Sequence, residues 1–279
     1  MGGQRIMAGQ ACERCRGTGF EIVERDGRDF AQPCACRRSA AGARGDFVTA
    51  CRIPPRYEEC SFTNFEGFTP SLRNALERSM LYCNDYPHLG STHEGLGLLF
   101  TGTNGIGKTH LAVAVLRELW TRKGVRGHFW DFHELTREIR DSYNPETKTT
   151  ELQVLEPVIR ADVLLLDDLG AWKMTDWIND TLFHIMNSRY MAKRATLITT
   201  NFEDADRTTA VKAESDYFER KRKGEAAAPP PREFLLERTG VAVRSRLMEM
   251  CVVIKVSGTD YREARQTSNQ ARTGGAVKS

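Results

Sequence analysis

The stretch LGLLFTGTNGIGKT, residues 96–109, joins an apolar run to a glycine-rich turn. The apolar run predicts a buried strand over Leu96–Thr101, and leucine and valine at intervals of four predict a helix over Lys108–Lys123. Between them, Gly102–Thr109 fits the pattern G-x-x-x-x-G-K-[ST] in full. Glycines let successive backbone N–H groups turn toward a phosphate, and a helix N-terminus adds positive partial charge. The stretch therefore predicts a nucleotide-phosphate site at the end of a buried strand.

The side chains of this predicted site have separate roles. Lys108 is expected to reach the β- and γ-phosphates, and the hydroxyl of Thr109 is a ligand for Mg²⁺. The alternative is a chance glycine-rich turn, which the flanking strand and helix disfavour. ATP and Mg²⁺ are accordingly the expected cofactors. The residues expected to contact the nucleotide are Gly102, Thr103, Asn104, Gly105, Ile106, Gly107, Lys108, Thr109 and His110.

Two further strand ends carry polar residues suited to phosphoryl transfer. The apolar run Val163–Leu166 is followed by Asp167 and Asp168. Because ligands of open α/β folds bind at the carboxyl ends of strands, we expect Asp167 to hold Mg²⁺ and Asp168 to activate the attacking water. Asn201 ends the next apolar strand, where an amide can bond the γ-phosphate or that water. The structural alternatives are helix caps for the aspartates and a turn residue for the asparagine.

Short apolar runs alternate with helical patterns along residues 96–202, which predicts an α/β domain with a parallel sheet flanked by helices. The other predicted strands are Arg126–Phe132, Val163–Asp167, Ala195–Thr200 and Cys251–Val256. The other predicted helices lie near Glu134–Ser142, along the apolar face of Leu152, Leu155 and Ile159, and over Asp176–Met191.

The composition divides the chain into zones. Residues 1–45 form a Cys-rich head, and residues 46–95 a linker with a lead-in helix. Residues 96–262 form the nucleotide-binding domain, in which 203–238 is a charged, proline-rich insertion. Within it, the charged cluster Glu219–Lys223 and the following Pro229–Pro231 are expected to form a solvated loop rather than a binding tail. Residues 263–279 are expected to be a disordered tail.

The overall composition is that of a globular protein. Hydrophobic residues make up 40% of the chain and charged residues 28%, which excludes collagen-like and wholly disordered chains. The net charge of +3 neither requires nor excludes a nucleic-acid partner. The apolar runs fall far short of the ~18 residues that a bilayer span needs, and the first residues lack the apolar core of an export signal. We therefore expect a cytoplasmic protein with no membrane partner.

Six of the eight cysteines lie in the first 60 residues. Cys12 and Cys15 form C-x₂-C, and Cys34 and Cys36 form C-x-C after a gap of 18 residues. Four thiolates in two close pairs suit tetrahedral Zn²⁺, and a small hairpin across Asp26-Gly27 can join the pairs. A segment this short has no room for an apolar core of its own. A bound metal would therefore supply its folding energy. A redox-active or incidental cysteine cluster is the alternative.

The order of these motifs resembles that of AAA+ ATPases of the initiator group. Asp167-Asp168-Leu169-Gly170 resembles their Walker B sequence, and the segments C-S-F-T-N-F at 60–65 and T-D-Y-R at 259–262 resemble segments of the DnaC/DnaI helicase loaders and the related IstB transposition helpers. The resemblance spans about residues 55–262. It implies an AAA+ P-loop fold and ATP hydrolysis that is slow and stimulated by DNA or a partner.

The resemblance also assigns two arginines. Arg246 matches the arginine finger that enters a neighbouring subunit's ATP site, with the adjacent Arg244 as a competitor for that role. Arg262 matches the second sensor, which touches nucleotide in cis. Two departures weaken these matches: Asp168 stands where many AAA+ proteins carry Glu, and 203–238 is longer than expected before the finger.

The function implied is a homo-oligomeric replication factor that loads the replicative helicase onto single-stranded DNA. Its head either grips the helicase or, through the basic residues Arg37, Arg38 and Arg44, contacts DNA. DNA contacts are expected around 147–150 or 171–177, although Trp172 and Trp177 can equally pack on the sheet. Three alternatives stay open: an IstB-type helper of a transposase, a nucleotide-bound scaffold without turnover, and a small-molecule kinase whose lid carries Arg220, Arg222, Arg232 and Arg238.

Overall fold

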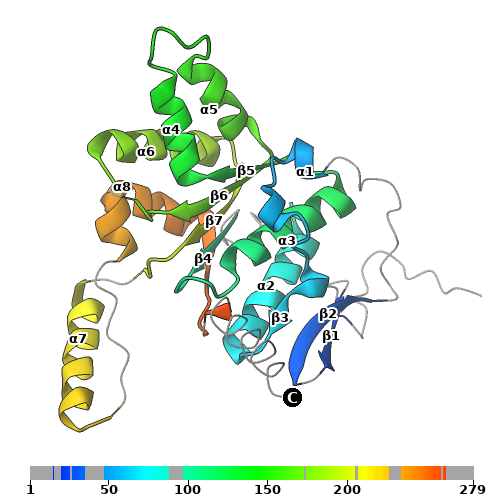
Figure 1. Cartoon of the computed structure of the whole chain (residues 1–279), viewed down its shortest axis with the longest axis vertical. Coiled ribbons are helices and arrows are strands. Elements are labelled where there is room, and N and C mark those ends of the chain that lie inside the picture. Colours follow the sequence, from blue (N-terminus) through cyan, green and yellow to red (C-terminus); the bar gives the residue numbers. More distant parts are fainter. Residues whose placement is uncertain are drawn as a thin grey trace, which may run out of the picture.

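The structure is a computed structural model that describes residues 15, 20–25, 27–34, 47–87, 97–172, 174–204, 207–225, 234–258 and 260–261. Figure 1 shows the arrangement of its elements. The strands are β1 (Phe20–Arg25), β2 (Arg28–Pro33), β3 (Glu66–Gly67), β4 (Gly97–Thr101), β5 (Gly127–Asp131), β6 (Val163–Leu169), β7 (Ala195–Thr200) and β8 (Cys251–Lys255). The helices are α1 (Phe47–Ala50), α2 (Pro70–Asp85), α3 (Lys108–Lys123), α4 (Phe132–Asp141), α5 (Glu151–Arg160), α6 (Asp176–Met191), α7 (Arg207–Arg222) and α8 (Leu235–Met250), with short 3₁₀ turns η1 (Pro55–Tyr57) and η2 (Phe62–Asn64).

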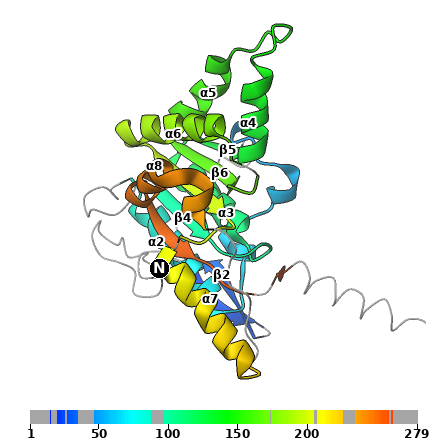
Figure 2. The ribbon, with the colours of Figure 1, turned by 90° about the vertical axis from the view of Figure 1, so that its left-hand side faces the viewer.

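The central sheet is parallel, with strand order β5-β6-β7-β4-β8. Successive residues of its strands alternate between two buried clusters, as the strand period of two requires. Leu98 and Phe100 pack toward α2 and α3, whereas Leu99 packs toward α4, α5, α6 and α8. The sheet is thus covered on both faces, as expected of parallel sheets. In both views α6 lies beside α8, while α4 and α5 project together beyond one edge (Figures 1 and 2).

The predicted strands and helices of the core are present. The predicted bounds of α3, α6 and β7 agree with those observed. The expected apolar face of α5 is wrong in one position, because Leu152 is 71% exposed while Val154, Leu155 and Val158 are buried. The side chain of Thr150 caps this helix, which leaves Leu152 in a first turn that faces solvent.

The segment before the sheet packs into the main core. β1 and β2 form the antiparallel hairpin expected across Asp26-Gly27, and β2 also pairs antiparallel with β3. Phe20 and Ala31 of this hairpin are buried in the same cluster as α2 and α3, and the ring of Phe20 meets Phe62 edge-on at 5.4 Å. The hairpin therefore shares the apolar core of the nucleotide-binding domain.

The expectation of a solvated loop from the charged cluster Glu219–Lys223 to Pro231 is wrong at its start, because residues 219–222 are helical. Residues 207–222 form α7, which stands apart from the other helices in Figure 1. Its last turns carry Glu219, Arg220, Lys221 and Arg222, all residues of high helix propensity, and Glu219 pairs with Lys223 at 2.8 Å. Charge alone thus supports a helix here without an apolar stripe.

Within the described ranges, no helix combines the length and the apolar character that crossing a membrane requires.

Candidate nucleotide site

The turn between β4 and α3 is built on glycines with positive φ. Gly102, Gly105 and Gly107 have φ of 141°, 74° and 95°. A Cβ atom would lie 2.0 Å from the Val256 oxygen at Gly102, and 2.8 Å from the Phe65 ring at Gly107. Side chains are therefore excluded from this turn on both backbone and steric grounds. The turn leads directly into the N-terminus of α3, which is the arrangement that binds phosphate.

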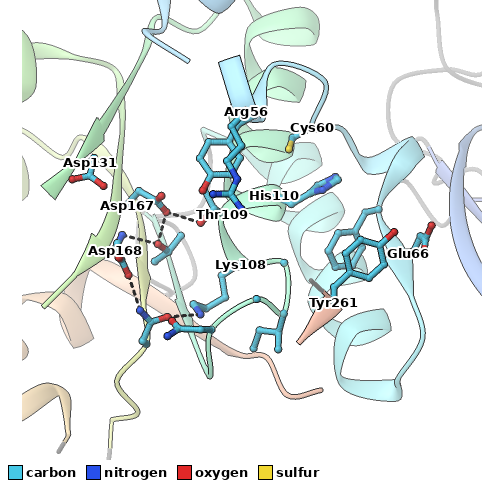
Figure 3. Close-up of a pocket in the computed structure, with 18 of the residues that line it drawn as sticks. Arg56, Cys60, Glu66, Lys108, Thr109, His110, Asp131, Asp167, Asp168 and Tyr261 are labelled. Atoms are coloured by element: carbon cyan, nitrogen blue, oxygen red, sulfur yellow. Dashed lines mark hydrogen bonds between the residues drawn. The ribbon is translucent and has the colours of Figure 1, made fainter. Parts of the chain in front are cut away.

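Lys108 lies at the first position of α3 and is buried. Its ammonium donates to the carbonyls of Gly102 and Thr103, at 2.9 and 2.6 Å, and to Oδ1 of Asn201 at 2.8 Å. The amide of Asn201 in turn donates to Oδ1 of Asp168 at 2.6 Å. One asparagine thus links the P-loop lysine to the Walker B acid (Figure 3).

The strand order explains why these residues meet. β7 lies between β4 and β6, so its carboxyl end places Asn201 between the P-loop and the Asp pair. The P-loop, the Asp167–Asp168 pair and the amide of Asn201, all predicted as site residues, therefore converge at one edge of the sheet. Asp168 adopts φ of 58°, and Thr199 accepts a hydrogen bond from its backbone N–H at 2.9 Å. A non-glycine residue in this conformation is uncommon and points to a functional constraint.

Asp167 is buried and accepts two hydroxyl hydrogen bonds on Oδ1. Thr109 donates at 2.8 Å and Thr199 at 2.5 Å. Burial raises the pKa of Asp167 to about 6, with the neighbouring Asp168 adding to the rise and the two hydroxyl bonds opposing it. A cation beside this carboxylate would favour its charged form. Thr109 and Asp167 bring hard oxygen donors to one point, which suits Mg²⁺.

A cavity of about 1160 Å³ lies over these groups. One wall is the P-loop with the ends of β6 and β7. The other wall is formed by segments around residues 56–68 and by Tyr261, which lie outside the phosphate-binding motifs. Phe65 covers Gly107, and Phe68 stacks on Tyr261 with ring centroids 5.6 Å apart. Tyr261 also donates its backbone N–H to the Gly105 carbonyl at 3.1 Å. The segments 60–65 and 259–262 were singled out only by resemblance, and no periodicity identifies them as a wall.

His110, expected to contact nucleotide, lines the same cavity but is fixed to the second wall. Its Nε2 lies 2.9 Å from the Ser61 carbonyl, and its ring meets Phe65 at 5.3 Å. Burial lowers the pKa of His110, so the ring is neutral at neutral pH. The residue therefore joins α3 to the segment 60–65.

The two candidate finger arginines lie on α8, away from the cavity lining. Arg244 makes a two-pronged ion pair with Asp204, whereas Arg246 pairs with Glu249 at 2.8 Å and lies over the Tyr190 ring. Arg262 falls outside the described residues, one position after Tyr261.

The predicted zinc ligands are only partly covered by the structure. Cys15 and Cys34 are buried, and the Cys34 thiol donates to Glu21 at 3.1 Å. Cys12 and Cys36 lie outside the described residues. Among the residues that are described, no group of three or more His, Cys, Asp or Glu is placed to hold a metal. The zinc site therefore stays a prediction.

Comparison with known proteins agrees with this site. Residues 88–211 match the family of IstB-like ATP binding proteins. The chain is 25% identical over 197 residues to the phage-like element PBSX protein XkdC of Bacillus subtilis, a match that covers 68% of this chain and 71% of XkdC. It is 27% identical over 150 residues to the replicative helicase loader DnaC of Escherichia coli, covering 53% of this chain and 58% of DnaC. It is 30% identical over 112 residues to the replicative helicase loader DnaI of Bacillus subtilis, covering 40% and 35%.

The fold is likewise shared with a solved structure. The crystal structure of the DnaC helicase loader superposes with a TM-score of 0.57 at 27% identity, covering 73% of this chain and 100% of that chain. The P-loop, the Asp pair and the Asn201 strand end lie within the matched residues 88–211. Residues 88–211, a little under half of the chain, are therefore similar to the IstB-like ATP-binding family, and the chain is related to the DnaC and DnaI helicase loaders.

Proposed function

We propose that this protein is an ATP-dependent loader of a replicative helicase. The observation that carries the proposal is the relation to DnaC and DnaI, together with the convergence of Lys108, Thr109, Asp167 and Asn201 at one site. The matches cover 58% of DnaC and 35% of DnaI. They therefore support the ATPase core directly, whereas the helicase as partner is inferred from the likeness of that core.

The proposed reaction is hydrolysis of ATP. The P-loop amides and Lys108 bind the phosphates, while Thr109 and Asp167 hold Mg²⁺, which neutralises charge on the transferred phosphoryl group. Asp168 orients the attacking water and accepts its proton. Asn201 already bridges Lys108 and Asp168, so it is placed between the γ-phosphate position and that water. Asp168 is shorter than the usual Glu, which supports slow turnover in the absence of a stimulating partner.

Assembly of several copies would complete the proposed site. Arg246 is the proposed finger, because Arg244 already pairs with Asp204, whose side chain is only 15% exposed. That pair connects α8 to the segment that follows β7. Arg246 is held from one side by Glu249, 46% exposed, at the protein surface. A neighbour's triphosphate would then replace this exposed pair, which contributes little to stability.

Single-stranded DNA is the proposed nucleic-acid ligand. Trp172 is 60% exposed and stacks on His133 with ring centroids 4.2 Å apart, whereas Trp177 packs against the core. The alternative that both tryptophans pack on the sheet therefore fits Trp177 alone. An exposed ring stacked on a second ring is a platform for a nucleic-acid base, and such stacking tolerates any sequence.

Zinc is proposed for the N-terminal segment, with Cys12, Cys15, Cys34 and Cys36 as ligands. The support is that two of these four thiols are buried beside the β1–β2 hairpin. Closed tetrahedral thiolate sites of this kind are structural. Metal analysis of the purified chain tests it, and a chain that folds without bound zinc contradicts it.

The decisive experiment is helicase loading onto single-stranded DNA by the wild type and by Lys108→Ala. We expect the variant to lose loading and nucleotide binding together, because the phosphates lose their principal cation. Full loading by Lys108→Ala would contradict the proposal. Phosphate release measured with and without DNA separates hydrolysis from the kinase alternative. In that alternative the lid arginines would reach the site, yet the described ones, Arg220, Arg222 and Arg238, do not line the cavity.

The second candidate is a transposition helper. The observation in its favour is the match of residues 88–211 to the IstB-like family. Its ATPase chemistry would be the same and its partner would be a transposase. Affinity capture from lysate with the ATP-bound protein, scored for replicative helicase against transposase, distinguishes the two.

A further inference from the structure

The nucleotide cavity is lined by an arginine that no ATPase motif accounts for. Arg56, on η1, belongs to the wall opposite the P-loop. Figure 3 shows its side chain extending from η1 toward Thr109, at the end of the cavity where Asp167 lies. Glu66 and Tyr261 lie toward the other end in the same view.

The charged residues that line the cavity favour a second protein cation when a triphosphate is bound. Five carboxylates line it, namely those of Glu59, Glu66, Asp131, Asp167 and Asp168, against the permanent charges of Arg56 and Lys108. A triphosphate adds about four further negative charges, which one Mg²⁺ and one lysine do not balance in a partly desolvated site.

The backbone that carries Arg56 is held firmly to the P-loop helix. Pro54 and Pro55 restrict the chain just before it. Just after it, Arg117 of α3 donates to the carbonyls of Glu58 and Cys60, the second at 2.8 Å. The position of η1 is thereby fixed relative to Thr109, which lies in the first turn of the same helix.

The side chain itself is available. Arg56 is exposed, and within the described part of the chain it forms no ion pair; its one ring contact is with its neighbour Tyr57, at 5.9 Å. Arg52 on the same segment behaves differently, because it pairs with Glu138 at 3.2 Å and lies 3.7 Å over the Trp130 ring.

We propose that Arg56 is a phosphate-binding residue that contacts the γ-phosphate in cis and so distinguishes a triphosphate from a diphosphate. Its guanidinium would approach from the side opposite Lys108, with a planar fork that matches phosphate oxygens. This inference rests on the proposed ATPase function and concerns the same site.

The test is calorimetric titration of the full chain with AMPPNP and with ADP, each with Mg²⁺. For Arg56→Ala we expect AMPPNP affinity to fall about ten- to a hundredfold, the range for a charge-assisted contact, and ADP affinity to change by less than about threefold. Arg56→Lys keeps the charge without the fork, and should retain part of the preference for the triphosphate. Arg52→Ala is the matched control and should bind both nucleotides as the wild type does.

Each other result overturns the assignment. Equal weakening for both nucleotides would assign Arg56 to the base, ribose or β-phosphate, and unchanged binding of both would make it a surface arginine. Wild-type protein that binds neither nucleotide would remove the ATPase function itself. If the wild type binds both nucleotides and Arg56→Ala binds them with the same affinities, only this inference fails and the ATPase function stands.

Discussion

Asp167 is the residue at which stability and function conflict most clearly. Its carboxylate is buried beside Asp168, and burial raises its pKa to about 6. Two threonine hydroxyls reduce the cost of its charge without removing it, because both donate to the same oxygen. Above pH 6 the nucleotide-free protein therefore holds Asp167 in the charged form that a magnesium site needs, and this charge lowers the stability of the fold.

We therefore expect Asp167→Asn to stabilise the nucleotide-free protein. The wild-type cost accumulates as pH rises from the ordinary pKa of 3.8 to about 6, and is constant above that. At pH 7.5 the variant's free energy of unfolding should be higher by at most about 3 kcal/mol. Urea unfolding in EDTA at pH 5 and pH 7.5 measures this, and the gain should be smaller at pH 5.

The same variant should bind Mg·ATP more weakly, because an amide is a poorer ligand for Mg²⁺ than a carboxylate. Equal stability of wild type and variant at pH 7.5 would show that Asp167 carries no electrostatic cost.

Among the elements, α6 is tied to its neighbours by one buried arginine. Arg189 donates to the carbonyls of Val158, Ile159 and Ala161 at the end of α5, at 2.9 to 3.1 Å. It also donates to the Thr196 hydroxyl at 3.0 Å in β7. Burial lowers its pKa to about 9, so it stays charged at neutral pH. One guanidinium therefore satisfies the helix-end carbonyls that α5 leaves without intrahelical partners.

Replacing this residue should be costly. Arg189→Met leaves several buried carbonyls without a donor, and we expect the free energy of unfolding to fall by about 3–5 kcal/mol. Arg194→Met is the comparison variant, since Arg194 is one-third exposed, pairs with Asp162 at 3.5 Å and donates to a single α5 carbonyl, that of Arg160, at 2.6 Å. Guanidinium unfolding of both variants measures the difference, and equal losses would contradict a special role for Arg189.

Whether an element could be predicted depended on what stabilises it. β4, β6 and β7 were predicted correctly because burial on both faces makes them continuous apolar runs, and α6 because burial on one face gives its apolar residues a helical period. α7 was missed because its described side chains, those of residues 215–222, are exposed or half-buried, and its charges are equally compatible with a loop. Arg189 gave no signal at all, since a single arginine in an amphipathic helix is usually exposed.

For the molecule as a whole, the first wall of the site could be predicted and the second could not. Parallel strands end at one edge of the sheet, so Lys108, Asp167 and Asn201 were expected to meet, and they do. Phe68 and Tyr261 are 193 positions apart and stack through tertiary packing alone. No local pattern in the sequence encodes such a contact.

The same limit applies to the N-terminal segment, which the sequence describes as a separate head. Its hairpin instead shares a core with α2 and α3, through Phe20, Ala31 and their contact with Phe62. We therefore expect Phe20→Ala to destabilise the nucleotide-binding domain itself, by about 3–4 kcal/mol. A hairpin that folded as an independent unit would leave that domain unchanged.

Tryptophan fluorescence during urea unfolding separates these outcomes, because all four tryptophans lie between residues 120 and 177 and none is in the hairpin. Phe20→Ala should shift the fluorescence transition to lower urea, whereas Val23→Ala, on the same strand and outside the shared core cluster, should shift it little. A transition that is unchanged in Phe20→Ala would show that the hairpin folds as a unit separate from the nucleotide-binding domain. A shifted one would mean that any partner bound by the hairpin acts on the same folding unit as the ATP site.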